Sequence, residues 1–178
     1  SAEASTASTT EASVLASLFG AVSGRDRSDW QFDADQYKWI AAQTGPLQVD
    51  AFCDSEGRNM QPGCTEYWHA ADSALNRSWA GRRVWMNPPY EYDMLDKVLE
   101  HAVLSHASSP TDTTIVGVVP LWHGRKHMRW LRYFTELRRY PAGTTLYTAA
   151  MHDGERVAMG PTQWPVAAIA LLPAVCTH

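Results

Sequence analysis

The sequence predicts an α/β domain built on a mostly parallel sheet that ends in an antiparallel hairpin. Three observations predict it. Helical patterns alternate with apolar strands through the middle of the chain, the strand expected at 113–122 is apolar almost without interruption, and two further strands follow near the C-terminus. With 178 residues, 45% of them hydrophobic, the chain can bury one substantial core. We therefore expect one minimal domain over residues 25–178.

Residues 1–24 are expected to form a leader outside that domain. Ser, Thr and Ala dominate its opening stretch "SAEASTASTTEAS", which is typical of a disordered linker, and the pattern that follows allows one short helix. No basic start precedes a sustained apolar run, so we expect no signal peptide. No segment has the length and apolar character of a membrane span, so no membrane partner is expected.

The elements of the domain are expected in the following order. Asp33 caps a helix that Gly45-Pro46 ends, and the buried strand "LQVDAFCDS" follows. A short strand in "EYWHAADSAL" and a clear one in "RRVWMNPPY" precede an amphipathic helix that begins near Asp93. After the apolar strand, the spacing predicts a helix over 124–140 and then two strands, "TTLYTAA" and "PVAAIALLP". In such sheets, ligands bind outside the carboxyl ends of the strands.

Charge and cysteine content narrow the functional classes. The formal net charge is −4, so binding to nucleic acid would depend on a local basic patch. The cysteines, Cys53, Cys64 and Cys176, lack the CxxC spacing of a metal or redox pair. This usage favours an intracellular, reducing compartment, the cytoplasm or nucleus, and argues against secretion. Nothing in the sequence predicts an oligomeric state.

The strand "RRVWM" leaves through an unusual corner, Asn87-Pro88-Pro89-Tyr90. Proline removes a backbone N–H, fixes φ and pushes the preceding residue toward extended geometry, so this corner is stiff and rich in carbonyl oxygens. The Asn87 side-chain oxygen and the Pro88 carbonyl can accept the two hydrogens of an NH₂ group, and Tyr90 can stack on the ring that carries it. The alternative interpretation is a proline-rich strand exit with a buried tyrosine.

These four residues match the motif of amino-group methyltransferases that use S-adenosylmethionine. The chain around them resembles the small Dam-like DNA N6-adenine methyltransferases of phages and their relatives in DIRS-type retroelement polyproteins, over roughly residues 28–173. The matching positions are Asp50, Asn59, Tyr67, Asp72, Leu75, Trp79 and Asn87 to Tyr90. The chain departs from the family at Phe32-Asp33, where a Thr-Pro is usual, and it lacks the glycine-rich turn that most methyltransferases place after their first strand.

The resemblance implies a Rossmann-like, S-adenosylmethionine-dependent methyltransferase sandwich that acts on the 6-amino group of adenine in DNA without a metal. The catalytic residues implied are Asn87, Pro88, Pro89 and Tyr90. The residues implied on the cofactor side are Asp50, Ala51, Phe52 and Asp72. Asp50 could equally be a turn residue, and Asp72 an N-cap. Two alternatives stay open: methylation of an RNA adenine or a protein glutamine amide, and an inactive module that binds nucleic acid or other segments of a mobile-element polyprotein.

A basic stripe is the candidate nucleic-acid surface. Arg125, Arg129, Arg132 and Arg139 recur at intervals that would place them on one face of a helix, where they could hold phosphates of DNA or RNA. The candidate contacts are Arg125, Lys126, Arg129 and Arg132. A solvated helix face is the commoner explanation of this spacing. His123 and His127 have the spacing of two metal ligands but lack an evident third, so no metal is expected.

Overall fold

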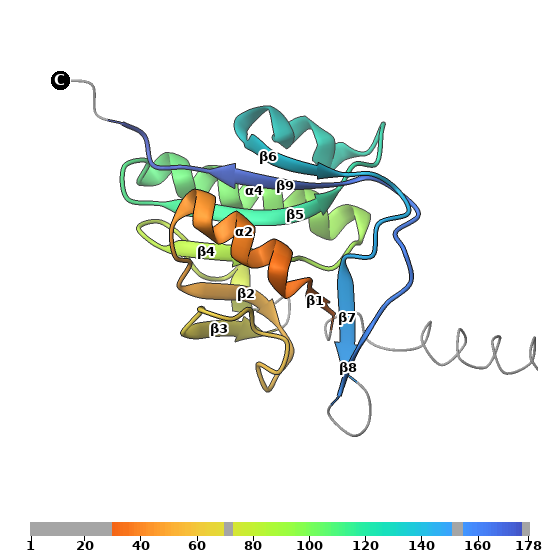
Figure 1. The fold of residues 1–178 in the computed structure, drawn as a ribbon. Coiled ribbons are helices and arrows are strands. Elements are labelled where there is room, and N and C mark those ends of the chain that lie inside the picture. The colour runs from red at the N-terminus through yellow and green to blue at the C-terminus, as the bar shows by residue number, and fades with distance from the viewer. Residues whose placement is uncertain (1–29, 70–72, 151–154, 176–178) are drawn as a thin grey trace, which may run out of the picture.

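The computed structural model describes residues 30–69, 73–150 and 155–175. Within them, a six-stranded sheet carries α2 (Ala34–Thr44) on one face and α4 (Tyr92–Ser108) on the other, and a three-stranded sheet stands beside the carboxyl ends of the central strands (Figure 1). The leader and its expected helix lie outside the described residues. In the described part of the chain, no helix combines the length and apolar character needed to cross a membrane.

The large sheet is mixed, with strand order β3-β2-β4-β5-β9-β6. Its strands are β2 (Val49–Cys53), β3 (Glu66–His69), β4 (Arg83–Met86), β5 (Thr114–Pro120), β6 (Thr135–Tyr140) and β9 (Val166–Leu171). The first four strands in this order pair in parallel, whereas β9 runs antiparallel to both β5 and β6. The α/β class and the parallel centre of the sheet are therefore confirmed.

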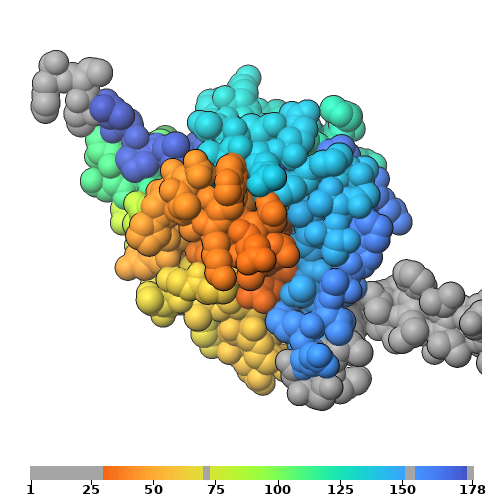
Figure 2. Space-filling view, viewed as in Figure 1, coloured from red at the N-terminus to blue at the C-terminus, as the bar shows by residue number. Residues whose placement is uncertain are grey.

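The two helices that cover the sheet arise as their sequences predict. Asp33 caps α2, because its carboxylate accepts hydrogen bonds from the N–H groups of Asp35 (3.1 Å) and Gln36 (2.9 Å). Tyr37 and Ile40 of α2 are buried in the core on one face of the sheet. The apolar stripe of α4 is buried on the opposite face, where it packs against β2, β4 and β5. Figure 2 shows α2 in orange over the middle of the visible face, with blue residues of the small sheet beside it.

The expected helix over 124–140 is wrong in its second half. Residues Lys126–Tyr133 form a 3₁₀ helix, η2, and residues 135–140 continue as β6. The reason is long-range: β9 is an entirely buried strand, and β6 supplies the backbone partners that its outer edge needs. The basic stripe is consequently divided, because Arg139 lies on β6 while Arg125 directly precedes η2.

The expected pairing of the last two strands is also wrong. The segment "TTLYTAA" forms β7 (Tyr147–Ala150), which pairs antiparallel with β1 (Gln31–Phe32) and with β8 (Arg156–Ala158) in the small sheet. The antiparallel partners of β9 are β5 and β6 instead. This arrangement carries the start of β7 to the carboxyl end of β4, where the candidate site lies (Figure 1).

A glycine allows β4 and β5 to approach closely just before that site. Gly117 of β5 pairs with Met86 of β4, and a Cβ on Gly117 would lie 2.1 Å from the Met86 carbonyl oxygen. Met86 is the residue before Asn87. The absence of a side chain at Gly117 therefore allows β5 to pair closely with the last residue of β4, directly before the corner.

Candidate active site

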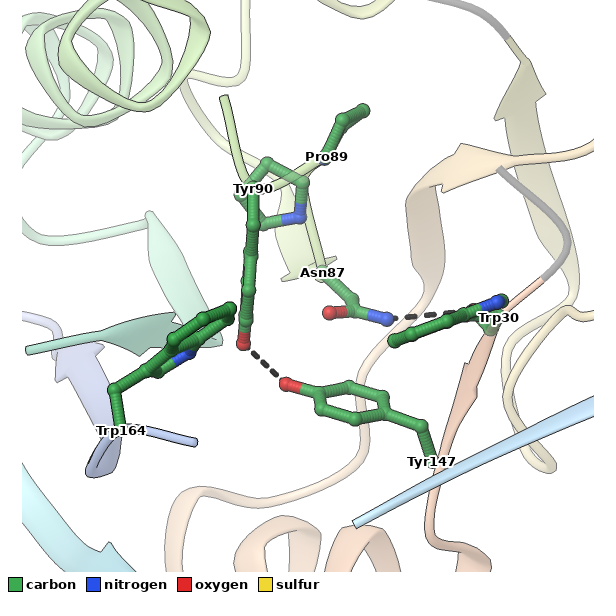
Figure 3. Close-up of a pocket in the computed structure, with 7 residues that line it drawn as sticks. Trp30, Asn87, Pro89, Tyr90, Tyr147 and Trp164 are labelled. Atoms are coloured by element: carbon green, nitrogen blue, oxygen red, sulfur yellow. Dashed lines mark hydrogen bonds between the residues drawn. The ribbon is translucent and has the colours of Figure 1, made fainter. Parts of the chain in front are cut away.

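A pocket of about 80 Å³ opens at the carboxyl end of β4. It is lined by residues from four separate segments: the one before β1, the corner after β4, the start of β7 and the loop before β9. These residues are Trp30, Asn87, Pro88, Pro89, Tyr90, Tyr147 and Trp164 (Figure 3). All four residues of the Asn-Pro-Pro-Tyr corner thus border one cavity, and six of the seven lining residues are aromatic or proline, with Asn87 as the polar exception.

Asn87 presents its amide oxygen to this pocket. Its Nδ2 donates a hydrogen bond to the Trp30 carbonyl oxygen at 3.4 Å, so the Oδ1 atom points away from Trp30, toward the space that Tyr90 borders (Figure 3). The turn that follows is closed by the Pro89 carbonyl, which accepts from the Glu91 N–H at 2.9 Å, so the Pro88 carbonyl takes no part in that turn hydrogen bond. The corner therefore offers hydrogen-bond acceptors at a position that stiff backbone fixes.

Tyr90 is held in place by aromatic neighbours. Its hydroxyl shares a hydrogen bond with the hydroxyl of Tyr147, and its ring lies edge-to-face with the rings of Tyr147 and Trp122, with centroids 6.0 Å apart in both cases. Burial raises the pKa of Tyr90 and of Tyr147 above the ordinary tyrosine value, so both hydroxyls stay neutral at physiological pH. Figure 3 shows the Tyr90 ring edge-on, with one face turned toward Asn87 and Trp30.

Three of the four residues expected on the cofactor side, Asp50, Ala51 and Phe52, lie in β2. Asp50 is only 3% exposed, and its carboxylate accepts hydrogen bonds from the N–H groups of Gln61 (3.0 Å) and Phe52 (3.4 Å). Burial raises the pKa of Asp50 to about 6. The side chains of Ala51 and Phe52 belong to the core, and Asp72 lies outside the described residues. Asp50 therefore ties β2 to the loop that follows it, by way of Gln61.

That loop is ordered by Asp54, which the sequence did not single out. The Asp54 carboxylate accepts from the N–H groups of Glu56 (2.9 Å) and Arg58 (3.0 Å) and from the Arg58 Nε (2.9 Å). Burial alone would raise the pKa of Asp54, but these hydrogen bonds and the Arg58 charge lower it below the usual value. The charged carboxylate therefore closes the loop as a compact turn at the carboxyl end of β2.

Asn59 links this loop to the Asn-Pro-Pro-Tyr corner. Its Oδ1 accepts from the Asp54 N–H at 2.8 Å, and its Nδ2 donates to the Trp30 carbonyl oxygen at 3.3 Å. Asn87 donates to that same carbonyl. Two neighbouring parallel strands, β2 and β4, thus end in loops whose asparagines share one acceptor.

The four basic residues expected to contact nucleic acid have different surroundings. Arg129 forms an ion pair with Asp96 of α4 at 3.1 Å, and Trp130 donates to the same carboxylate, so Arg129 fastens η2 to α4. Arg132 contacts the ring and hydroxyl of the neighbouring Tyr133, and Lys126 is exposed. Of the four, Arg125 alone is among the residues that line the groove next to the pocket.

Metal-binding side chains do not gather in the part of the chain that is described: no group of three among His, Cys, Asp and Glu is close enough to hold an ion. His127 is buried and its Nε2 lies 2.9 Å from the Pro120 carbonyl oxygen, whereas His123 is exposed. Cys53 and Cys64 are buried free thiols. Burial raises the pKa of the Cys64 thiol to about 11, which keeps it protonated and unreactive.

Comparison with protein families gives a match. A family model described as DNA N-6-adenine-methyltransferase (Dam) matches residues 21–129, which is more than half of the chain. The matched stretch contains α2, β2, the corner after β4 and the whole of β5. A search of the curated proteins finds no match. The family resemblance predicted from the sequence motifs is thereby confirmed.

Proposed function

Because the chain belongs to the DNA N-6-adenine-methyltransferase (Dam) family, we propose that it transfers a methyl group from S-adenosylmethionine to the 6-amino group of adenine in DNA. The observation that carries this proposal is the pocket in which Asn87 turns an amide oxygen toward a space bordered by the Tyr90 ring. The mixed sheet, with helices on both faces, is compatible with a methyltransferase-like fold, and we take it to be Rossmann-like.

The corner would compensate for the weak nucleophilicity of an aromatic amine. In adenine, the lone pair of the 6-amino nitrogen is drawn into the ring. Asn87 Oδ1 and the Pro88 carbonyl oxygen would accept the two N–H groups, which favours a pyramidal nitrogen and restores electron density to it. Tyr90 would stack on the ring and fix the direction of the lone pair, and Pro89 keeps the corner rigid. The nitrogen lone pair would form the new N–C bond as the methyl–sulfur bond breaks and leaves a neutral thioether, and the nitrogen would then release its extra proton to water while Asn87 Oδ1 accepts a hydrogen bond from it.

The residues around β2 fit a cofactor site next to this corner. S-adenosylmethionine, when bound, supplies an electrophilic methyl group on a sulfonium sulfur. Asn59 and Asn87 both donate hydrogen bonds to the Trp30 carbonyl oxygen. This shared acceptor keeps the loop after β2 beside Asn87, whose Oδ1 would accept from the amine, and the fit rests on that arrangement. Positioning of the reacting atoms provides most of the catalysis in a direct displacement.

The expected cofactor residues would act in different ways. The buried Asp50 would hold the loop after β2 in shape through Gln61, and so act as a positioning residue. Ala51 and Phe52 would contribute backbone rather than side chains, because their side chains pack in the core. For Asp72, the family resemblance alone supports a role on the cofactor side.

The test is methyl transfer to separate substrate pools. The purified chain is incubated with methyl-labelled S-adenosylmethionine and with DNA, RNA or protein, and each product is digested to its monomers. Label at the 6-amino group of adenine from DNA is the expected result, and Asn87→Ala should lose it. Label in RNA or in protein glutamine instead would assign the motif to that substrate. No label anywhere, together with no heat of cofactor binding in calorimetry, would favour the non-catalytic module.

A further inference from the structure

A second, larger groove of about 760 Å³ adjoins the pocket at the Asn-Pro-Pro-Tyr corner. It runs past the start of α4 and the end of β5, and it shares two aromatic side chains with the pocket, Tyr90 and Trp164. Its lining is Tyr90, Glu91, Tyr92, Leu121, Trp122, His123, Arg125 and Trp164. Whatever occupies this groove therefore lies directly beside whatever occupies the pocket.

Aromatic rings form one wall of the groove. Trp122 lies edge-to-face with Tyr92 (centroids 5.2 Å apart), with Trp164 (5.1 Å) and with Tyr90 (6.0 Å). Three neighbours hold the Trp122 ring in one orientation, yet it is only half-buried, and Tyr92 is 53% exposed. Rigid and accessible aromatic rings of this kind are the surfaces on which single-stranded nucleic acids stack their bases.

Arg125 brings a positive charge to the rim of this wall. Its guanidinium lies 3.8 Å from the centroid of the Tyr92 ring and donates to the Tyr92 hydroxyl at 3.1 Å. Arg129 and Arg139 each form an ion pair, with Asp96 and Glu136 respectively, but Arg125 has no carboxylate partner among the described residues. A guanidinium that is oriented by an aromatic ring, and that keeps donors unused by carboxylates, suits a phosphate.

The groove also contains one carboxylate. Glu91, the residue before α4, lines it without forming an ion pair to Arg125 within the described part of the chain. A carboxylate repels a phosphate group but accepts hydrogen bonds from the amino groups of bases. The combination of aromatic wall, unpaired guanidinium and single carboxylate therefore matches a whole nucleotide better than an isolated anion.

We propose that this groove holds the nucleotide that flanks the target adenine on the same strand, with its base on the wall formed by Trp122 and Tyr92 and its phosphate on Arg125. The inference rests on the proposed function, because it places the target adenine in the neighbouring pocket. Tyr90 borders both cavities and separates the two bases. When the methyl group is transferred, the substrate strand is therefore either single-stranded or has at least two nucleotides flipped out of the duplex.

Binding of a short single-stranded DNA that contains adenine tests the proposal without any methyl transfer. In fluorescence anisotropy, Arg125→Ala should weaken binding roughly 10-fold and lower the salt dependence by about one phosphate contact. Tyr92→Ala, at an exposed position, should weaken binding by a similar factor. The matched control is Arg139→Ala, which removes the same charge from β6 outside the groove and should change binding less than about 2-fold.

Crosslinking maps the flanking base independently of these variants. DNA with a photoreactive pyrimidine next to the target adenine should crosslink to the peptides that contain Tyr92 or Trp122. If the wild-type protein methylates DNA but Arg125→Ala binds as tightly as Arg139→Ala, or the crosslink maps elsewhere, the groove assignment is overturned while the proposed function stands. If groove variants weaken binding and the crosslink maps to the groove, but no DNA is methylated, the proposed function fails and the groove remains a nucleotide site.

Discussion

The hydroxyl pair of Tyr90 and Tyr147 offers the sharpest test of how the pocket is built. The two hydroxyls bind each other, and Tyr147 is only 4% exposed whereas Tyr90 is half-buried at the pocket. Tyr90→Phe leaves the Tyr147 hydroxyl buried without a partner, which costs about 1–3 kcal/mol of unfolding free energy. Tyr147→Phe should cost less, toward about 1 kcal/mol, because water in the pocket can reach the Tyr90 hydroxyl.

Removal of both hydroxyls should be close to neutral, since no buried donor is then left unsatisfied. The double variant is therefore expected to be more stable than the sum of the single variants predicts, by a coupling energy of about 2–4 kcal/mol. Urea unfolding of the four proteins measures this coupling directly, and in thermal melts each 1 kcal/mol corresponds to roughly 2–4 °C for a domain of this size. Strict additivity would refute the hydrogen bond and, with it, the fixed orientation of the Tyr90 ring.

Three other changes have defined outcomes. Asn87→Ala should lower the single-turnover rate of methyl transfer about 10²–10³-fold, yet cost no more than about 1 kcal/mol of stability because it gives up one long hydrogen bond; an unchanged rate would remove Asn87 from the mechanism. Gly117→Ala should lower the free energy of unfolding in urea by at least about 1–3 kcal/mol, because its Cβ would meet the Met86 carbonyl oxygen. The control Gly160→Ala, in open space, should be nearly neutral. Equal effects of the two variants would contradict the close approach of β4 and β5. Burial raises the pKa of Asp50 to about 6. The folded state therefore keeps a proton that the unfolded chain releases near pH 4. As a result, the stability that this group contributes is lost as the pH rises from about 4 to about 6. The unfolding free energy of Asp50→Asn relative to wild type should therefore rise by about 2–3 kcal/mol across that range, and a flat difference would contradict the buried carboxyl.

Local signals were enough to predict the elements that position the corner. The α2 helix begins at an aspartate cap and buries residues at helical spacing, and both features are written in consecutive residues. The Asn87–Tyr90 corner is likewise a local feature, because proline constrains the backbone wherever it occurs. Short-range chemistry therefore identified the part of the molecule that now lines the pocket.

Long-range partners decided what the sequence did not predict. Residues 135–140 read TELRRY, which does not alternate strictly between polar and apolar side chains and so also fits a helix, and the open edge of β9 selects the strand. Trp30, Tyr147 and Trp164 complete the pocket from segments far apart in the chain, and nothing in their immediate neighbours marks them. The positions of Trp30 and Tyr147 follow from the pairing of β1 with β7, which no local pattern specifies, and Trp164 lies in the loop before β9.

The Trp30 carbonyl suggests how two loops from different strands would serve the proposed methyl transfer. A methyl donor and an amine must be held within a few tenths of an ångström of their reacting geometry, so the loop after β2 and the corner after β4 need a common reference. A carbonyl oxygen has two lone pairs and can accept from Asn59 and Asn87 together. Since Trp30 immediately precedes β1, and β1 is fixed by β7, the small sheet sets that reference. The large sheet thus places β2 and β4 side by side, and the small sheet fixes the carbonyl that aligns the loops at their carboxyl ends.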